Sequence, residues 1–229
     1  MKILAIDTAH PAVSVCLLSG QLGELLALET MPMVRGHSEA LLPLIERVMA
    51  ASGLAFDALD RIAVVVGPGS FTGIRIGIAA ARAIGLACDI PVVGVSSLSA
   101  FAAPLIGRSG GAVIAAGVDA KHGHIYVQGY GPQGQNILAP RLATVRDAVR
   151  ALGSGPLQLT GSGAPMMAIE AWSMGIEADV VGQTVAPDIA FVAHLGTLAD
   201  PSKNLARPYY LKPPDAQPQT KGLIARVTS

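Results

Sequence analysis

Two short segments carry the residue types that bind phosphate groups. Asp7-Thr8 ends an apolar run that predicts the first strand, and Gly67-Pro-Gly-Ser-Phe-Thr-Gly73 joins a second apolar run to a helix. Hydroxyls and the free N–H groups of a helix start are suited to an anion. The spacing matches neither a P-loop nor a dinucleotide-binding fingerprint. Each segment also has an explanation without a ligand, since Asp7 can cap a strand end and Ser70 or Thr72 can cap the helix.

Histidines and carboxylates come together at two places that invite comparison with metal sites. His37 and Glu39 open a helical segment, but Leu41 and Leu42 occupy the positions where a second helical ligand is needed. A second cluster follows a later strand and comprises Asp119, His122 and His124. In a strand, one of these side chains faces away from the others. We therefore expect no metal site, with His37 capping or packing at the helix start and a polar hairpin after Asp119.

No residue is a clear candidate nucleophile. The sequence has no Gly-x-Ser-x-Gly elbow. Cys16 and Cys88 lie in apolar runs without metal-ligand spacing, so we expect two buried thiols. These observations predict a chain with no catalytic residue of its own.

The elements that must position these residues follow from the hydrophobic pattern. Residues 2–6, 12–18 and 22–30 alternate or run apolar between turn signals, which predicts three strands in a meander. Beyond them the pattern predicts helix 38–52, strand 62–66, helix 73–88, strand 92–95 and helix 97–106. A second meander begins after Arg108-Ser-Gly-Gly111, with strands 112–118, 124–130 and 135–139, helix 144–152, strand 157–160, a helix through Met166 and Trp172, and helix 187–198. This order predicts an α/β protein of two lobes, each a mixed sheet with flanking helices.

One helical ridge consists almost entirely of small residues. Gly73, Gly77, Ala81 and Gly85 recur every four residues. Glycine inside a helix costs roughly 1 kcal/mol relative to alanine, so the ridge needs a reason. The expected reason is the close approach of a second helix. Pro43, in the preceding helix, predicts a bend near Glu39.

Composition and charge limit the class of protein. The 229 residues are 51% hydrophobic and 14% charged, with a formal net charge of zero and 4% aromatic residues, which argues against an unaided grip on nucleic acid. Residues 201–229 carry a net charge of +4, from five Lys and Arg against one Asp, and contain five prolines that exclude regular structure. Without a signal peptide or an uninterrupted apolar span, we expect a cytoplasmic protein that does not enter a membrane.

Four segments together resemble the TsaB/YeaZ family, the bacterial scaffold subunits of the tRNA threonylcarbamoyladenosine (t6A) machinery. They are Ile3–Thr8, His37–Pro43, Gly67–Gly77 and Pro208–Asp215. The resemblance implies two lobes like those of actin, Hsp70 and sugar kinases. We expect an N-terminal lobe at 1–107, a smaller lobe at 108–200 and a proline-rich basic tail at 201–229.

The resemblance also implies a function without catalysis. TsaC would make threonylcarbamoyl-adenylate and TsaD would transfer the group to tRNA, helped by the ATPase TsaE, while this chain would hold TsaD in a competent conformation. Helices 38–52 and 73–88 would pack against the equivalent pair of TsaD. The implied interface residues are His37, Leu41, Leu42, Ile45, Gly73, Ile74, Gly77, Ile78 and Ala81. The same apolar face could pair two copies of the isolated chain, and tRNA would be met through the complex. Gly77→Leu is then expected to leave the monomer folded and to abolish co-purification with TsaD.

The chain departs from the family pattern at several positions. Asp7-Thr8-Ala9 replaces Asp-Thr-Ser, Leu41 and Leu42 replace the second metal-binding histidine of TsaD, and His124 replaces a glutamate. We expect no intrinsic cofactor, and ATP or ADP only in the complex. The residues that could contact a nucleotide are Asp7, Thr8, Asp119, Gly161 and Gly163. The alternative is a small ATP-dependent kinase or ATPase acting through Asp7, Thr8 and Asp119, although phosphoryl transfer needs a fuller set of metal-holding carboxylates and a base. A nucleic-acid-binding module is the third hypothesis.

Overall fold

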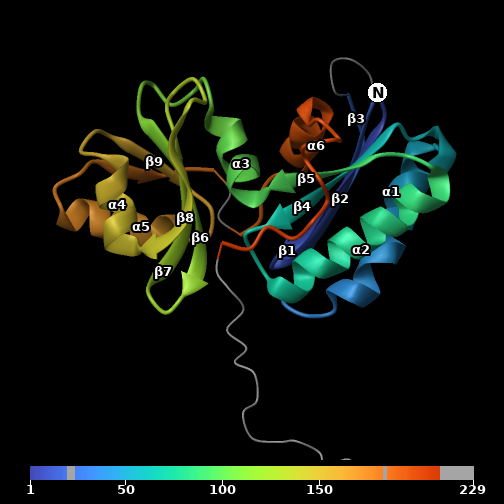
Figure 1. The fold of residues 1–229 in the computed structure, drawn as a ribbon, viewed down its shortest axis with the longest axis horizontal. Helices are drawn as coiled ribbons and strands as arrows, with labels where there is room; N and C mark the ends of the chain where they lie inside the picture. The colour runs from blue at the N-terminus through green and yellow to red at the C-terminus, as the bar shows by residue number, and fades with distance from the viewer. Residues whose placement is uncertain (20–23, 183–184, 212–229) are drawn as a thin grey trace, which may run out of the picture.

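The chain forms two lobes with the same strand order. The computed structural model describes residues 1–19, 24–182 and 185–211 (Figure 1). The first sheet has the order β3-β2-β1-β4-β5, and the second has the order β8-β7-β6-β9-β10 when it is written in the same direction. In each sheet the first three strands pair antiparallel, and the parallel pairs lie on the other side of the first strand, β1–β4–β5 in one sheet and β6–β9–β10 in the other. The prediction of two mixed-sheet α/β lobes is confirmed.

The first lobe contains β1 (Ile3–His10), β2 (Ala12–Ser19), β3 (Glu24–Pro32), α1 (His37–Ser52), β4 (Arg61–Gly67), α2 (Phe71–Cys88) and β5 (Val92–Ser96), with a short 3-10 turn at Phe56–Ala58. The strand β4 is buried after Arg61, as its uncharged apolar sequence predicts for a central parallel strand. Gly53 ends α1 in the left-handed conformation. The helix runs continuously through Pro43.

The second lobe repeats this plan. It contains β6 (Val113–Lys121), β7 (His124–Tyr130), β8 (Asn136–Thr144), α4 (Val145–Leu152), β9 (Leu157–Thr160), α5 (Ala164–Ser173) and β10 (Ala178–Val180). The strand β10 was not predicted, because three residues are too few to show an alternating pattern. The strand β8 continues to Thr144, beyond the predicted end at 139.

Two helices pack against the lobe on the other side of the predicted boundary at 107/108. α6 (Ile189–Leu198) was assigned to the second lobe, but it packs on the first sheet, against β1, β2, β4 and β5. Gly196 permits this contact, since a Cβ there would lie 2.5 Å from the Cβ of Ala63. α3 (Ser97–Ala102), followed by a 3-10 turn at Ala103–Leu105, lies between the sheets. Its Leu98 and Phe101 join the core of the second lobe, and its Ala100 joins that of the first.

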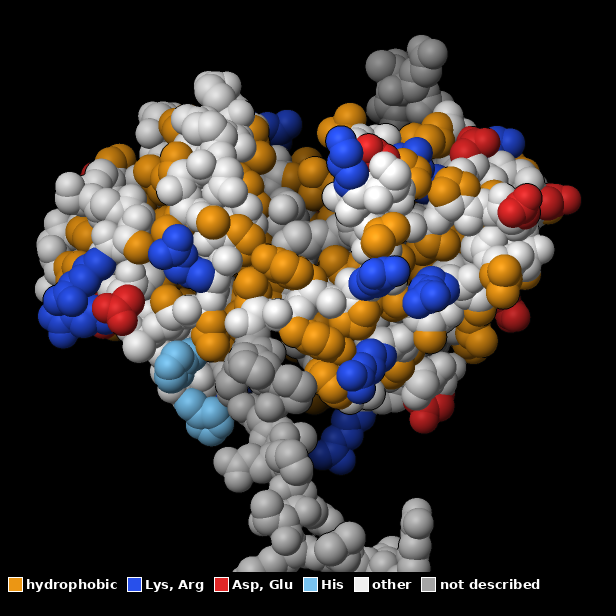
Figure 2. Space-filling view, in the orientation of Figure 1, with side chains coloured by type: hydrophobic (Ala, Val, Ile, Leu, Met, Phe, Trp, Pro, Cys, Tyr) orange, Lys and Arg blue, Asp and Glu red, His pale blue; other side chains and the backbone are white. Residues whose placement is uncertain are grey.

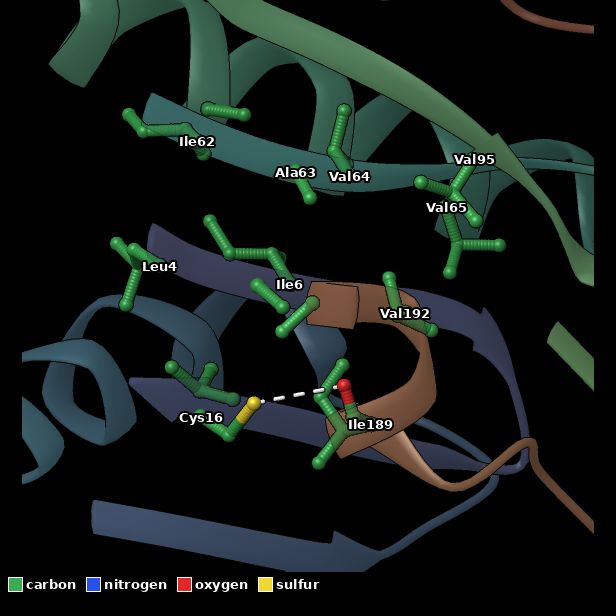
Figure 3. Close-up of a cluster of buried hydrophobic side chains, with 14 of the residues drawn as sticks. Leu4, Ile6, Cys16, Ile62, Ala63, Val64, Val65, Val95, Ile189 and Val192 are labelled. Carbon is green, nitrogen blue, oxygen red and sulfur yellow. Dashed lines mark hydrogen bonds between the residues drawn. The ribbon is translucent and has the colours of Figure 1, made fainter. Parts of the chain in front are cut away.

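The first sheet is therefore covered on both faces. α1 and α2 lie on one face and α6 lies on the other (Figures 1 and 3). Figure 3 shows Ile189 and Val192 of α6 directed at the strand residues. By length and composition α2 could cross a membrane, but in the fold one face of it packs against β1 and β4.

The two cysteines differ in exposure, contrary to the prediction that both are buried. Cys16 is buried, its Sγ–H donates to the Ile189 carbonyl at 3.4 Å, and burial raises its pKa to about 12. Cys88 is only half-buried at the end of α2. A thiol reagent that needs the thiolate, applied to the native chain at about pH 8, is expected to modify Cys88 and to spare Cys16 until the chain unfolds. Modification of Cys16 and Cys88 at equal rates in the native protein would contradict the burial of Cys16.

Candidate functional site

A cleft of about 490 Å³ lies between the two lobes. The first lobe contributes the last two residues of β1 and the residue after them (Ala9–Pro11), His37 and the Gly69-Ser70 segment before α2. The second lobe contributes the end of β6 (Val118–Lys121) and the loop residue Ser162. The repeated topology brings these segments together, because the first hairpin of each lobe faces the other across the cleft.

Asp7 lies behind this cleft in a fully buried position. Its Oδ1 accepts the Ala9 N–H at 2.7 Å, which confirms the predicted strand-end role. Its Oδ2 is buried and has no hydrogen-bond partner among the described residues. Burial raises the pKa of the carboxyl, and the nearby His10 and His37 only partly oppose that shift.

His10 and His37 complete the polar group at the end of β1. The His10 side chain is 4% exposed, its ring meets Phe101 of α3 edge-on at 5.2 Å, and its Nε2 has no partner among the residues that the structure describes. Burial lowers the pKa of His10. His37 uses Nε2 to donate to the His10 carbonyl at 3.0 Å, so this nitrogen carries its proton. The ring of His37 thus ties α1 to β1 and lines the cleft.

Asp7→Asn is expected to raise the melting temperature at about pH 7 by about 2–4 °C, the shift that about 1 kcal/mol causes in a chain of this size. Burial holds the folded pKa of Asp7 above the ordinary value of an aspartate, so the carboxyl favours the unfolded, ionised chain increasingly as pH rises above that ordinary value. Asparagine keeps the acceptor for the Ala9 N–H and cannot ionise. The difference between the two proteins should shrink as pH falls toward about 4. A wild-type chain that melts higher than the variant at neutral pH would contradict the raised pKa.

Thr8 is not available to a nucleotide in this structure. Its hydroxyl is buried and donates to the Gly73 carbonyl of α2 at 2.7 Å. The neighbouring Ser70 N–H donates to the Ala9 carbonyl at 2.8 Å, and the Ser70 hydroxyl caps α2 by accepting the Gly73 N–H. These bonds lock the end of β1 to the first turn of α2. The prediction of a phosphate contact by Thr8 is therefore corrected, and of the two cap candidates Ser70 is the cap.

Of the second-lobe residues predicted to contact a nucleotide, Asp119 lines the cleft, and Gly161 and Gly163 do not. The carboxylate of Asp119 is held by Lys121, through the backbone N–H at 2.8 Å and Nζ at 2.7 Å. Partial burial acts to raise the pKa of Asp119, but the bonds from Lys121 outweigh it, so the pKa is lowered. Gly161 and Gly163 have a packing reason: a Cβ at Gly161 would strike the Gly117 carbonyl, and one at Gly163 would strike the Ile125 side chain. Both glycines let the turn before α5 sit close to β6.

The metal-like clusters are not assembled by the fold. Within residues 1–19, 24–182 and 185–211, no group of three or more His, Cys, Asp or Glu side chains could hold a metal ion. Glu39 is exposed and accepts from Ser38 at 2.7 Å. His124 donates a hydrogen bond from Nδ1 to the His122 carbonyl oxygen at 3.0 Å, within the β6–β7 turn.

The small-residue ridge of α2 faces the chain's own sheet, which corrects its assignment to a partner. A Cβ at Gly73 would strike the Thr8 carbonyl oxygen, and one at Gly77 would lie 2.5 Å from Thr8 Oγ1 and 3.4 Å from Val64 Cγ2. A Cβ at Gly85 would strike Val92 Cγ2. Ala81 is fully buried. The periodicity correctly predicted a close approach, but the approaching elements are strands β1, β4 and β5 of the same lobe and not a helix of another chain.

Most of the predicted apolar interface residues are also internal. Leu41, Ile45, Ile74 and Ile78 are buried in the first lobe. Leu42 differs, because its side chain is 54% exposed. Of the large hydrophobic side chains in the predicted interface, Leu42 is the one that remains free to meet another protein.

The position of Leu42 on α1 defines a face shared with α2. Arg47 pairs with Glu29 of β3, so it marks the side of α1 turned toward β3. Leu42 lies about 140° from Arg47 around the helix, on the side turned toward α2. The neighbouring flank of α2 carries the half-buried Ile76 and Ala80. We call Leu42, Ile76 and Ala80 the docking face.

Two features of the cleft were not predicted. His10 was interpreted only as part of a turn, and Lys121 was not singled out. The signal for His10 was a polar residue directly after Asp7-Thr8 at the end of an apolar strand. The partner of Lys121 could not be foreseen, because it depends on the left-handed backbone that Lys121 and His122 adopt in the β6–β7 turn.

Comparison with known proteins decides the family. The family model TsaD, tRNA N6-adenosine threonylcarbamoyltransferase, matches residues 31–199, more than half of the chain. The TsaB proteins of Escherichia coli and Bacillus subtilis are 38% and 34% identical over 55% of this chain. The chain belongs to the TsaD family and, within it, to the TsaB/YeaZ proteins. The resemblance found in the sequence is confirmed.

Solved TsaB/YeaZ structures agree with this assignment along most of the chain. A Pseudomonas aeruginosa protein described as similar to the peptidase YeaZ is 25% identical, with a TM-score of 0.73 over 92% of this chain and 99% of that one. YeaZ from the same organism is 26% identical, with a TM-score of 0.69 and the same coverage. The chain spans about half the length of the curated relatives it matches, which are named tRNA threonylcarbamoyladenosine biosynthesis protein TsaB.

Proposed function

We propose that the chain is a non-catalytic scaffold subunit of the t6A modification complex and binds the TsaD transferase subunit through the docking face. The observation that carries the proposal is the exposed Leu42 on α1, opposite the apolar flank of α2, in a TsaB/YeaZ protein. A Leu that becomes covered contributes about 1.5–3 kcal/mol. TsaE and tRNA would join through the TsaD complex.

The state of the cleft supports a role without catalysis. Thr8 is bonded to α2, Asp119 is paired with Lys121, and burial raises the pKa of Asp7. Phosphoryl transfer needs carboxylates that hold metal and a base beside an acceptor pocket. Nucleotide would then bind only in the complex, if the TsaD subunit supplies the missing groups.

Solution mass of the chain mixed with its cognate TsaD tests the scaffold proposal. We expect a complex with one copy of each chain, and self-association of the isolated chain that TsaD reverses, because both contacts would cover the same apolar face. Two species that keep their separate masses would overturn it.

The kinase or ATPase alternative has one observation in its favour, since Asp7 Oδ2 and His10 Nε2 are unpartnered near the cleft. Calorimetry of the full chain with Mg-ATP separates the two functions. The scaffold proposal expects no heat of binding and no turnover. Micromolar binding with turnover would favour the enzyme.

A further inference from the structure

α2 has a second flank that the docking face does not use. α1 lies over β2 and β3, α2 lies over β1 and β4, and the segment after α6 lies at the far side, where Val93 bridges to Leu205 and the Tyr209 N–H donates to the Val66 carbonyl. α2 is therefore flanked by α1 on one side and by residues 204–211 on the other. The docking face adjoins α1, so the flank beside residues 204–211 is separate from it.

A groove of about 590 Å³ runs along this second flank. Arg82 and Leu86 of α2 form one wall, and Leu205 and Arg207 form the other. Leu86 is 87% exposed. Asp89, at the C-terminal end of α2, is the acidic residue of the lining. Figure 2 shows Lys and Arg side chains separated by hydrophobic ones over the face that carries α2.

A third arginine is fixed at the N-terminal end of the same flank. The Arg75 guanidinium lies 3.6 Å from the centre of the Phe71 ring, and its Nε donates to the Tyr210 hydroxyl at 3.0 Å. Phe71 and Tyr210 stack at 5.3 Å, and both remain partly exposed. Arg75 and Arg82 are seven residues apart, which is about 10 Å along the helix. That distance spans about three nucleotides of a stacked strand.

The arginines of this flank form no ion pair in the described part of the chain. Ion pairs there involve other cations, namely Arg47, Lys121, Arg146 and Lys203. Asp89 is the one carboxylate that lines the groove with Arg82 and Arg207, and with Arg75 added the flank carries a net charge of +2 from three cations and one carboxylate. In the sequence, Lys212, Lys221 and Arg226 follow against Asp215.

We propose that this flank binds a single strand of RNA, with Arg75, Arg82 and Arg207 on its phosphates and Phe71 and Tyr210 beside its bases. Arginine forks bind phosphate oxygens in pairs, and partly exposed aromatic rings stack bases without regard to sequence. The aromatic end favours RNA over an acidic protein segment, which would need the cations but not the exposed rings. The inference rests on the proposed function, in which the complex acts on tRNA, and it assigns a direct contact to this subunit.

The test is fluorescence anisotropy with a labelled single-stranded RNA and the full-length chain, alone and with TsaD. Arg82→Glu/Arg207→Glu is expected to weaken binding at least about 10-fold at low salt. It should also flatten the dependence of log K on log salt by about 1.4, since each lost phosphate contact of a single strand removes about 0.7. The matched control is Arg108→Glu/Arg150→Glu, which makes the same charge change at two exposed arginines away from the groove. It should bind as the wild type does.

Other outcomes separate this inference from the scaffold proposal. TsaD binding, measured by solution mass, should survive Arg82→Glu/Arg207→Glu. If this variant loses TsaD binding and keeps its RNA affinity, the groove is assigned to a protein partner and the RNA site is overturned. Equal losses in the groove variant and its control, or no RNA binding by the wild-type chain at low salt, would overturn it as well.

Discussion

Gly77→Leu is expected to lower the melting temperature of the isolated chain by about 2–12 °C. The first added carbon would already lie 2.5 Å from Thr8 Oγ1, and the rest of the side chain would be forced between α2 and β4. Overpacking of a core costs about 1–3 kcal/mol, and each kcal/mol lowers the melting temperature of a chain of this size by about 2–4 °C. Breaking the Thr8 bond to Gly73 would add to that cost. Thermal unfolding of the chain without TsaD measures the effect.

Ala79→Leu is the control for this change. Ala79 is two residues further along α2 and exposed, so the same side chain should leave the melting temperature nearly unchanged. This expectation reverses the one drawn from sequence alone, in which the Gly77 variant would fold and lose only its partner. A stable Gly77→Leu monomer that fails to bind TsaD would restore the earlier interpretation.

Leu42→Asp is expected to weaken TsaD binding by at least about 30-fold, or about 2 kcal/mol, while the melting temperature stays the same. Leu42 is more than half exposed, so the folded monomer gains little from its apolar side chain. A carboxylate covered by a partner without a cation to meet it loses its water and gains nothing in return. Titration of TsaD in solution gives the affinity.

Ile169→Asp provides the comparison in the second lobe. Ile169 is 66% exposed on α5, so this variant introduces the same charge at a similarly apolar surface position. It should bind TsaD with wild-type affinity. Equal affinity of the Leu42 and Ile169 variants would remove the docking face from α1.

The fold was predictable from the sequence because its signals are local. Uncharged runs such as Ile62–Val66 marked buried strands, and the repeated meander marked the second lobe. The direction in which α2 turns its glycines was not predictable. A ridge without side chains suits a strand as well as a helix, and only the position of Thr8 beside Gly73 decides between them. The sheet against which α6 packs was not predictable either, because the apolar pattern of a helix does not specify which sheet it covers.

The cleft was predictable in part. The sequence grouped Asp7 with Asp119 as possible nucleotide contacts, and in the structure Asp119 lines the cleft while Asp7 is buried two residues before Ala9, which also lines it. The direction of each carboxyl's pKa shift was not predictable. It depends on burial for Asp7 and, for Asp119, on the turn that brings Lys121 to the carboxylate. Of the nine predicted interface residues, the docking face keeps Leu42, and its neighbours on α2, Ile76 and Ala80, were added only when the exposure of each side chain was known.

The return of α6 to the first sheet has a consequence for synthesis on the ribosome. One face of β1, β2 and β4 is covered by a helix that leaves the exit tunnel only after the whole second lobe. Until then Ile3, Ala63 and Cys16 present an uncovered hydrophobic surface to solvent or to chaperones. A nascent chain stopped before Ile189 should aggregate, and the order of translation should make the N-terminal lobe the last part to reach its native state.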